Sequence, residues 1–466
     1  MSNATPVTPS ANAADSHYPL RLLERISYGA GDFGCSMYWV VFAQYLMYFY
    51  TDVAGLPVAA VSTMLLVTRL WDTINDPMMG LIADRTKSRH GCYRPWLIWM
   101  MAPLVISGIL VFTIPDISAK GKLIYAYITY TLVGMVYTAI NLPFAALMGV
   151  MSSNEKERTI LASFRYLGSN LGNLIPQLTI FAIVGFFGAN NQQTGYAAAM
   201  VCYGLLAAIL LWVAFRNTTE RVAVPVNVDN GSVVSDLRIL LRNIPWVILA
   251  IVGVLTLVWI SIRFSATVYY FKYNIGNQAL SSTFFALGTV GMMAGIACTK
   301  WVVQLVGDKR RAYMLVNVLA AVSIGGFYFV RPGDVYVMFA VQLLTSLLIG
   351  PILPLMYSLF ADSADYGEWK FGKRTTGLIF AAGSASNKMG WTFGGSIGGY
   401  ILAWYGYKAN VVQNEGTLYC IRSLMSWIPA LFACVSVVTI YFYPISDAKL
   451  DVIAGELALQ RAKRKD

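Results

Sequence analysis

The chain has 466 residues, of which 57% are hydrophobic and only 12% are charged, and its formal net charge is +11. A soluble domain carries about 25% charged residues, so this composition excludes an ordinary water-soluble protein and favours one embedded in lipid. The basic residues lie in short clusters between apolar segments rather than along one surface, which argues against nucleic-acid binding.

Twelve apolar segments are each long enough to span a bilayer, for which a helix needs about 20 residues. They predict an all-α membrane protein with two bundles of six helices, at residues 21–215 and 244–445. A polar central loop at 216–243 joins the bundles, and polar tails at 1–20 and 446–466 flank them, the first predicted to be disordered. The expected spans are 26–50, 58–82, 95–115, 122–150, 160–187, 195–215, 244–271, 279–306, 312–330, 335–360, 376–404 and 419–443.

Lys and Arg gather in one alternating set of loops, notably at 85–94, 216–242 and 309–311. Because cytoplasmic loops keep the excess of positive charge, we expect the central loop, both tails and both chain ends to be cytoplasmic. The six cysteines are scattered without a CxxC pair, so neither a disulfide framework nor a zinc site is indicated. The two histidines, His17 and His90, lie outside the spans, so proton transfer within the membrane would use carboxylates.

The second span, LVTRLWDTINDPMMGLI at 66–82, carries Arg69, Asp72, Asn75 and Asp76 in its middle. A charged side chain at the bilayer centre costs at least about 2.5 kcal/mol, so such residues usually face a polar path or a binding site. On a helix Asp72 lies within one turn of Asn75 and Asp76, so one face presents two carboxylates and a carboxamide together. We therefore expect the protein to work here.

The loop after this span contains Gly80, Asp84, Arg85 and Arg89 in the pattern G-x-x-x-D-R-x-x-x-R. The pattern resembles the helix 2 to 3 loop motif of the major facilitator superfamily, and a weaker echo, GDKRR at 307–311, follows the eighth span. Two such motifs at matching places are typical of a chain built from two repeated halves. A mixed-charge topology signal without further function is the alternative for this loop.

Within that superfamily the chain resembles the glycoside/pentoside/hexuronide cation symporters over nearly its whole length. The segments that carry the resemblance are ISYGAGDFG at 26–34, QYLMYFYTDVAGL at 44–56, LWDTINDPMMG at 70–80, GCYRPW at 91–96 and ADSADYGEWKFGKRTTG at 361–377. The resemblance implies the major facilitator fold, no enzymatic activity, and import of a sugar with a monovalent cation across the bacterial inner membrane. No cofactor is implied besides the coupling ion, Na⁺ or H⁺.

The resemblance places the cation site on Asp72, Asn75, Asp76 and Thr138. Hard oxygen donors suit Na⁺, and a carboxylate can instead take a proton, so the choice of ion stays open. A gating salt bridge, in which Arg69 or Lys388 neutralises one of the acids, is the alternative for the same cluster. Lys388 in GSASNKMGW matches the lysine that the family sets opposite these acids. The coupling and gating set is Arg69, Asp84, Arg85, Asp362, Asp365 and Lys388.

A sugar site needs hydrogen-bonding groups and an aromatic face for the ring. Asp32, Ser36 and Trp39 share one face of the first span, and Tyr137 and Asn141 share one face of the fourth. We expect both faces to line one site, although Trp and Tyr in spans are as often packing residues. The full expected sugar-binding set is Asp32, Ser36, Trp39, Tyr137, Asn141, Arg165, Arg263, Lys388 and Trp391.

Members that transport melibiose carry acids at the positions of Ser36 and Asn141 and a Trp at the position of Ala145. Those contacts cannot form here, so melibiose is not the expected substrate. Loss of the carboxylates together with Arg165 and Arg263 predicts a less acidic site that would accept an anionic sugar as well as a neutral one.

Other function classes lack their signatures in this sequence. No HExxH, GxSxG or P-loop motif indicates an enzyme, and no pore-lining repeat or filter segment indicates a channel. A proton-driven exporter of the same superfamily, or a carrier of another solute, is the alternative function. The sugar itself and the oligomeric state stay open.

Overall fold

The computed structural model describes residues 20–152, 154–189, 191–222, 233–372, 376–447, 449–450, 452–453 and 455–457. Every regular element in these ranges is a helix, which confirms the prediction of an all-α protein. The predicted N-terminal tail, apart from Leu20, and the end of the C-terminal tail lie outside the described residues.

The first half of the chain runs from α1 to α7. Its elements are α1 (Leu22–Tyr48) with the π-helical turn η2 (Phe49–Val53), α2 (Val58–Arg85), α3 (Arg94–Trp99), α4 (Met101–Val111), α5 (Ala119–Met151), α6 (Glu155–Phe187) and α7 (Gln192–Asn217).

The second half runs from α8 to α16. Its elements are α8 (Val233–Arg242), α9 (Ile244–Tyr269) with the π-helical turn η3 (Tyr270–Ile275), α10 (Leu280–Val306), α11 (Lys309–Gly326) with the 3₁₀ turn η4 (Phe327–Phe329), α12 (Val335–Ile349), α13 (Ile352–Phe371), α14 (Thr376–Trp404), α15 (Glu415–Met425) and α16 (Trp427–Tyr441).

Each of the twelve predicted spans coincides with one helix or with two consecutive helices. The third, tenth and twelfth spans, predicted as single helices, are each interrupted, between α3 and α4, α12 and α13, and α15 and α16. The break in the tenth falls at Gly350 and Pro351, where proline has no N–H for the helical ladder. The predicted central loop is partly helical, because α8 forms within it.

Eight helical stretches in the described ranges are long and apolar enough to cross a membrane, and they match the fourth to tenth and the twelfth predicted spans. The protein is therefore a multi-pass membrane protein. The other four predicted spans, α1, α2, the α3–α4 pair and α14, are helical too. Among these, α2 carries Arg69, Asp72 and Asp76 near its middle. The total of twelve spans stays a prediction.

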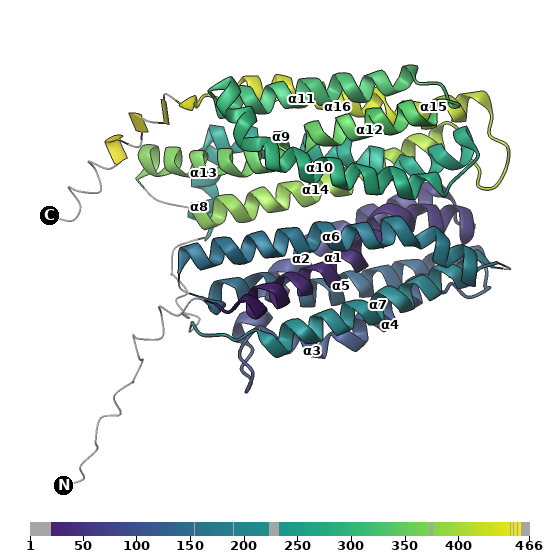
Figure 1. Ribbon diagram of the computed structural model, residues 1–466, viewed down its shortest axis with the longest axis horizontal. Coiled ribbons are helices and arrows are strands. Elements are labelled where there is room, and N and C mark those ends of the chain that lie inside the picture. Colours follow the sequence, from purple (N-terminus) through teal and green to yellow (C-terminus); the bar gives the residue numbers. More distant parts are fainter. Residues whose placement is uncertain are drawn as a thin grey trace, which may run out of the picture.

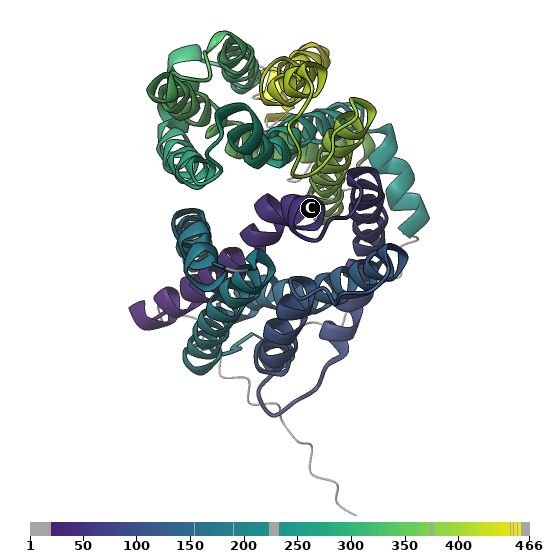
Figure 2. The same cartoon turned by 90° about the vertical axis from the view of Figure 1, so that its right-hand side faces the viewer.

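The two halves of the chain form two groups of roughly parallel and antiparallel helices. In Figure 1 the helices from α1 to α7 lie together below those from α9 to α16, and Figure 2 shows the same division end on. Contacts between the halves run through α2 with α14, α6 with α10, and α1 with α9. This is the arrangement expected of two repeated halves that pack face to face.

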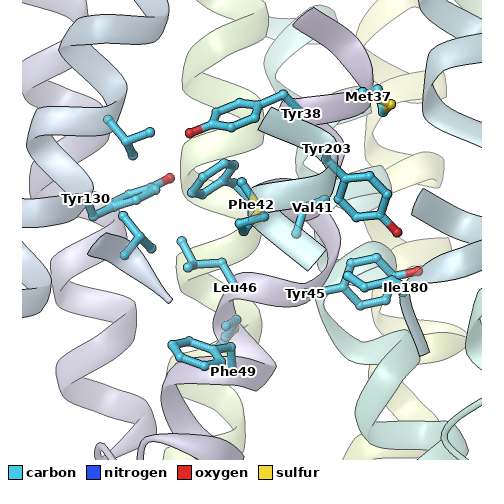
Figure 3. Packing of buried hydrophobic residues seen from close by; sticks show 14 of the residues in the cluster. Met37, Tyr38, Val41, Phe42, Tyr45, Leu46, Phe49, Tyr130, Ile180 and Tyr203 are labelled. Atoms are coloured by element: carbon cyan, nitrogen blue, oxygen red, sulfur yellow. The ribbon is translucent and has the colours of Figure 1, made fainter. Parts of the chain in front are cut away.

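The core of the first half is packed around α1. In Figure 3, Tyr38, Phe42 and Leu46 point to the side where Tyr130 of α5 lies. The opposite side of the helix meets Tyr203 of α7 and Ile180 of α6. Since α1 is surrounded in this way, its polar residues are held in fixed positions between neighbouring helices.

Glycines allow close helix approaches in both halves. A Cβ on Gly168 of α6 would lie 2.1 Å from the carbonyl oxygen of Gly29 on α1, and one on Gly394 of α14 would lie 2.4 Å from the carbonyl oxygen of Val258 on α9. Small residues at helix interfaces let backbones approach in this way within membranes. The pairs α1–α6 and α9–α14 therefore carry side chains that can meet at short range.

Candidate functional site

Asp76 stands where three helices meet. Its Oδ1 accepts a hydrogen bond of 3.2 Å from Thr138 Oγ1 of α5, and its Oδ2 contacts the Nζ of Lys388 on α14. The contact between Asp76 and Lys388 joins the two halves of the protein, because the residues are 312 positions apart. The structure thus brings together two residues of the expected cation site and the lysine expected to oppose them.

Asp72 lies on the same helix and is held by Arg69. The distance between Arg69 Nη1 and Asp72 Oδ2 is 3.5 Å, and the Asp72 side chain is 17% exposed. Asp72 Oδ1 packs against Gly134 of α5, where a Cβ would lie 3.1 Å away. Asn75 is buried, and its Nδ2 atom has no hydrogen-bond partner among the described residues.

Both helices that supply these residues contain an internal proline, Pro77 in α2 and Pro143 in α5. Proline has no N–H to donate, so the carbonyls of Thr73 and Ala139, one turn earlier, lose their usual helical partner. The two carbonyls lie within three residues of Asp76 and Thr138 in sequence. The side-chain oxygens of Asp72, Asn75, Asp76 and Thr138 could hold a monovalent cation here.

A second polar group lies between α1 and α6, where glycines bring the two helices close. Arg165 Nε donates to Asp32 Oδ1 at 3.0 Å, and the Asp32 side chain is buried. One turn further along α1, Ser36 Oγ and Ser169 Oγ are 2.6 Å apart. The Asp32 and Arg165 charges thus neutralise one another, while further N–H groups of the guanidinium can serve sugar hydroxyls.

The expected aromatic residues occupy two places. Trp39 stacks on Tyr137 with 4.3 Å between ring centroids, and the Arg69 guanidinium lies over the Trp39 ring at 4.5 Å from its centroid. Trp391 of α14 is 39% exposed, and its ring meets Phe264 edge-on. Asn141 of α5 is half-buried. The Arg69 contact links Trp39 to the helix that carries Asp72 and Asp76.

Arg263 does not join either group in the structure. It is buried in the second half, where its guanidinium lies 5.7 Å from the Phe284 ring centroid and 5.6 Å from that of Phe327. Its Nε donates to the carbonyl oxygen of Met425, and its Nη2 has no hydrogen-bond partner in the described part of the chain. The sequence pattern cannot reveal this, since it shows only that an arginine lies within a span.

Two of the expected gating residues near the loop motifs, Asp84 and Asp362, have partners inside their own halves. Asp84 Oδ1 accepts a hydrogen bond from Tyr93 at 2.7 Å, and Arg85 is exposed. In the second half, Lys309 of the GDKRR echo binds Asp362 with 2.5 Å between Nζ and Oδ2. Asp365, on the same helix as Asp362, is half-buried.

Sequence reasoning misses a third polar cluster, centred on Asp52 in η2. The Asp52 side chain is fully buried, with Lys272 Nζ at 2.7 Å from its Oδ1 and the hydroxyls of Tyr273 and Tyr407 donating to the carboxylate. Asn410 Nδ2 donates to the Asp52 carbonyl oxygen at 2.6 Å. The one available signal is an acid inside the segment QYLMYFYTDVAGL, because Lys272 has the pattern of an ordinary loop charge.

This cluster links the two halves of the protein at one end. Lys272, Tyr273, Tyr407 and Asn410 all belong to the second half, whereas Asp52 belongs to the first. Burial raises the pKa of Tyr407, and the neighbouring Tyr269 and Asp52 raise it further. The Tyr407 hydroxyl therefore keeps its proton and donates to Asp52.

Comparisons with known proteins agree with these features. The family model described as MFS/sugar transport protein matches residues 27–447. The inner membrane symporter YicJ of Escherichia coli K12 is 33% identical, over 94% of this chain and 95% of its own. The isoprimeverose transporter of Lactiplantibacillus pentosus is 31% identical, over 97% and 95%.

A solved structure supports the fold. A bacterial homologue of the human lysosomal transporter Spinster, in an inward-facing and unoccupied conformation, superposes with a TM-score of 0.68 at 11% sequence identity. The match covers 91% of this chain and 95% of that one. The relatives are transporters rather than enzymes, and the resemblance drawn from the motifs is confirmed. The chain therefore belongs to the MFS/sugar transport protein family.

Proposed function

We propose that this protein is a symporter that imports a glycoside, pentoside or hexuronide together with Na⁺ or H⁺ across the bacterial inner membrane. Family membership supports sugar transport, and the names of the two relatives add symport and isoprimeverose transport. The acids on α2 and the lysine opposite them support cation coupling. The basic loops and central linker support cytoplasmic chain ends.

The contact between Lys388 and Asp76 is the observation that carries this proposal. The Lys388 ammonium contacts the Asp76 carboxylate, which we expect to bind the cation, and the Thr138 hydroxyl donates to the same carboxylate. A small monovalent cation that enters between Asp76, Thr138 and Asn75 would take the place of this ammonium. Asn75 supports the exchange, because the nitrogen of its buried carboxamide has no partner among the described residues and the group can turn its oxygen toward the ion.

Displacement of Lys388 couples the ion to the sugar. The Lys388 side chain is 55% exposed. The ammonium released from Asp76 can therefore turn toward a sugar hydroxyl or carboxylate, and it does not have to enter a fully buried position to do so. By thermodynamic linkage this coupling is reciprocal. A sugar that holds Lys388 away from Asp76 strengthens cation binding by the same free energy by which the cation strengthens sugar binding. Asp32, Arg165 and Ser36 of the first half and Trp391 of the second supply the remaining sugar contacts in this proposal.

The Asp52 cluster takes part in the conformational change of the proposed transport cycle. It holds the ends of α1 and α9 together on the side opposite the expected cytoplasmic face, so the described conformation is closed to the outside. Import then requires this cluster to separate and re-form once in each cycle, with the two halves rocking about the site between them.

A ligand-binding screen of the purified protein tests the proposal. The probes are methyl β-D-xylopyranoside, methyl β-D-glucopyranoside and methyl β-D-glucuronide, each measured in NaCl and in choline chloride at two pH values. We expect one glycoside to bind, and Na⁺ or H⁺ to raise its affinity. Binding of no sugar, or sugar affinity that is equal in all four conditions, would contradict cation-coupled sugar transport.

A further inference from the structure

The ring of Trp39 contacts three neighbouring side chains. Tyr137 stacks on it at 4.3 Å with an interplanar angle of 25°, and the Arg69 guanidinium carbon is 4.5 Å from its centroid. Phe42 also stacks on it, with 5.8 Å between ring centroids and an interplanar angle of 29°. Trp39 is half-buried and therefore belongs to a Trp39 cluster that contains Tyr137, Phe42 and Arg69.

A sugar ring packs against an aromatic side chain through a free face, and the three neighbours of Trp39 leave little free face on its half-buried ring. Trp391 differs, since it is 39% exposed and its ring contact with Phe264 is edge-on at 5.6 Å between centroids. Trp391 can thus offer a face to a sugar. Sequence spacing alone cannot separate the two tryptophans, because both lie within apolar spans near polar residues.

The Trp39 cluster continues into the cation cluster. Arg69 lies between the Trp39 ring and Asp72, which it reaches at 3.5 Å, and the Tyr130 ring is 5.8 Å from its guanidinium carbon. The distance to Asp72 is long for a charge-assisted hydrogen bond, which is usually about 2.7–2.9 Å. The cation–π contact with Trp39 therefore competes with Asp72 for the position of Arg69.

We infer that Trp39 is a positioning residue for the cation site and not a sugar-stacking residue. By holding Arg69 on its ring, Trp39 limits how closely the guanidinium approaches Asp72, and so leaves that carboxylate free to help bind the coupling ion. Without the indole, Arg69 pairs more tightly with Asp72 and competes better with the cation. This inference rests on the proposed function, because it assigns Trp39 a role in the same cation-coupled sugar site.

Titrations of two single variants test the inference, with the glycoside that wild type binds and whichever of Na⁺ and H⁺ raises its affinity. In Trp39→Leu the cation concentration for half-saturation should rise about threefold or more, as expected for loss of one cation–π contact. Sugar affinity at saturating cation should stay within about twofold. Trp391→Leu should do the reverse, with sugar affinity reduced about fivefold or more and the cation half-saturation nearly unchanged.

A double-mutant cycle identifies Arg69 as the intermediary. If Trp39 acts through Arg69, Trp39→Leu should no longer change the cation half-saturation in an Arg69→Gln background. Trp39→Phe keeps a ring face for Arg69 and should give an intermediate shift, and it decides the question if Trp39→Leu does not fold.

Two results would overturn the inference. One is a fall of about tenfold in sugar affinity at saturating cation for Trp39→Leu or Trp39→Phe, with the cation half-saturation unchanged. The other is an equal effect of Trp39→Leu with and without Arg69. Failure of the proposed function looks different, because wild-type sugar binding would then be independent of Na⁺ and of H⁺.

Discussion

At the scale of single residues, Asp76 and Asp72 set the charge that the coupling ion compensates in the proposed site. Asp76→Asn and Asp72→Asn each remove one carboxylate from α2 while keeping side-chain size, so the ion loses its main ligand. We expect both variants to insert in the membrane and to lose accumulation of sugar against a gradient. Transport into membrane vesicles measures this.

The matched control is Asp116→Asn, which removes an exposed acid in the loop between α4 and α5 and should leave accumulation unchanged. Concentrative uptake at the wild-type level by Asp76→Asn would disprove the role given to the α2 acids.

Lys388 should matter more than its exposed position suggests. Lys388→Ala leaves the partly buried Asp76 without its cation in the ion-free state, and the energetic cost of leaving a fully buried acid unpaired is about 3–5 kcal/mol. The coupling ion no longer has to displace an ammonium, so ion affinity should rise while its effect on sugar affinity shrinks. Parallel titrations of ion and sugar measure both.

Lys120→Ala, which removes an exposed lysine, is the control. If Lys388→Ala keeps the wild-type cation dependence, the lysine is structural.

Arg263 gives a prediction about substrate class. The sequence predicts that Arg263 and Arg165 let the site accept an anionic sugar as well as a neutral one, but the structure encloses Arg263 among Phe284, Phe327 and Met425. Arg263→Met should therefore change the affinities for methyl β-D-glucopyranoside and methyl β-D-glucuronide by the same factor. The substitution removes a buried charge that contacts two rings and a backbone carbonyl and no carboxylate among the described residues, so the thermal stability should not fall. A selective loss of glucuronide binding would show that Arg263 belongs to the sugar site.

At the scale of helices, the π-helical ends of α1 and α9 form the proposed outer closure. Asp52→Asn keeps the size of the side chain but removes the charge that holds Lys272 and weakens its bonds to two tyrosine hydroxyls. Loss of about 1.4 kcal/mol of closure energy would shift the ratio of closed to open outer ends about tenfold. Spin labels at Pro57→Cys and Val412→Cys, both exposed near this end, report the distance between the halves.

We expect Asp52→Asn to broaden the distance distribution between these labels toward longer values and to slow transport, while sugar binding is retained. A distribution identical to that of the labelled protein with Asp52 intact would show that the Asp52 cluster does not hold the closed state.

Long apolar helices are predictable from the composition of the sequence, whereas contacts between helices are not. Apolar length locates α5 and α9 closely, and the acids of α2 point to a candidate ion site because charges within a span are costly. The break before α13 and the formation of α8 depend on local backbone chemistry at proline and on packing. In the Asp52 cluster, Lys272 binds Asp52 although the two residues are 220 positions apart in the sequence. No periodicity within one helix can reveal such a pairing.

At the scale of the whole molecule, the repeated halves explain why the site lies where it does. The glycine-mediated pairs α1–α6 and α9–α14 bring Arg165 to Asp32 in one half and present Lys388 and Trp391 from the other. The contact between Lys388 and Asp76 then crosses between the halves. Any motion of one half against the other must therefore alter the proposed ion site, which is the physical requirement for coupling ion binding to alternating access.

Uptake by purified protein in liposomes tests the central claim most directly. Liposomes with an inward Na⁺ gradient, an inward H⁺ gradient or neither are supplied with a radiolabelled glycoside from the binding screen. We predict transient accumulation above the external concentration under one of the two gradients, abolished by Asp76→Asn. Uptake that only equilibrates under every gradient, or sugar efflux driven by an inward H⁺ gradient, would contradict cation-coupled import.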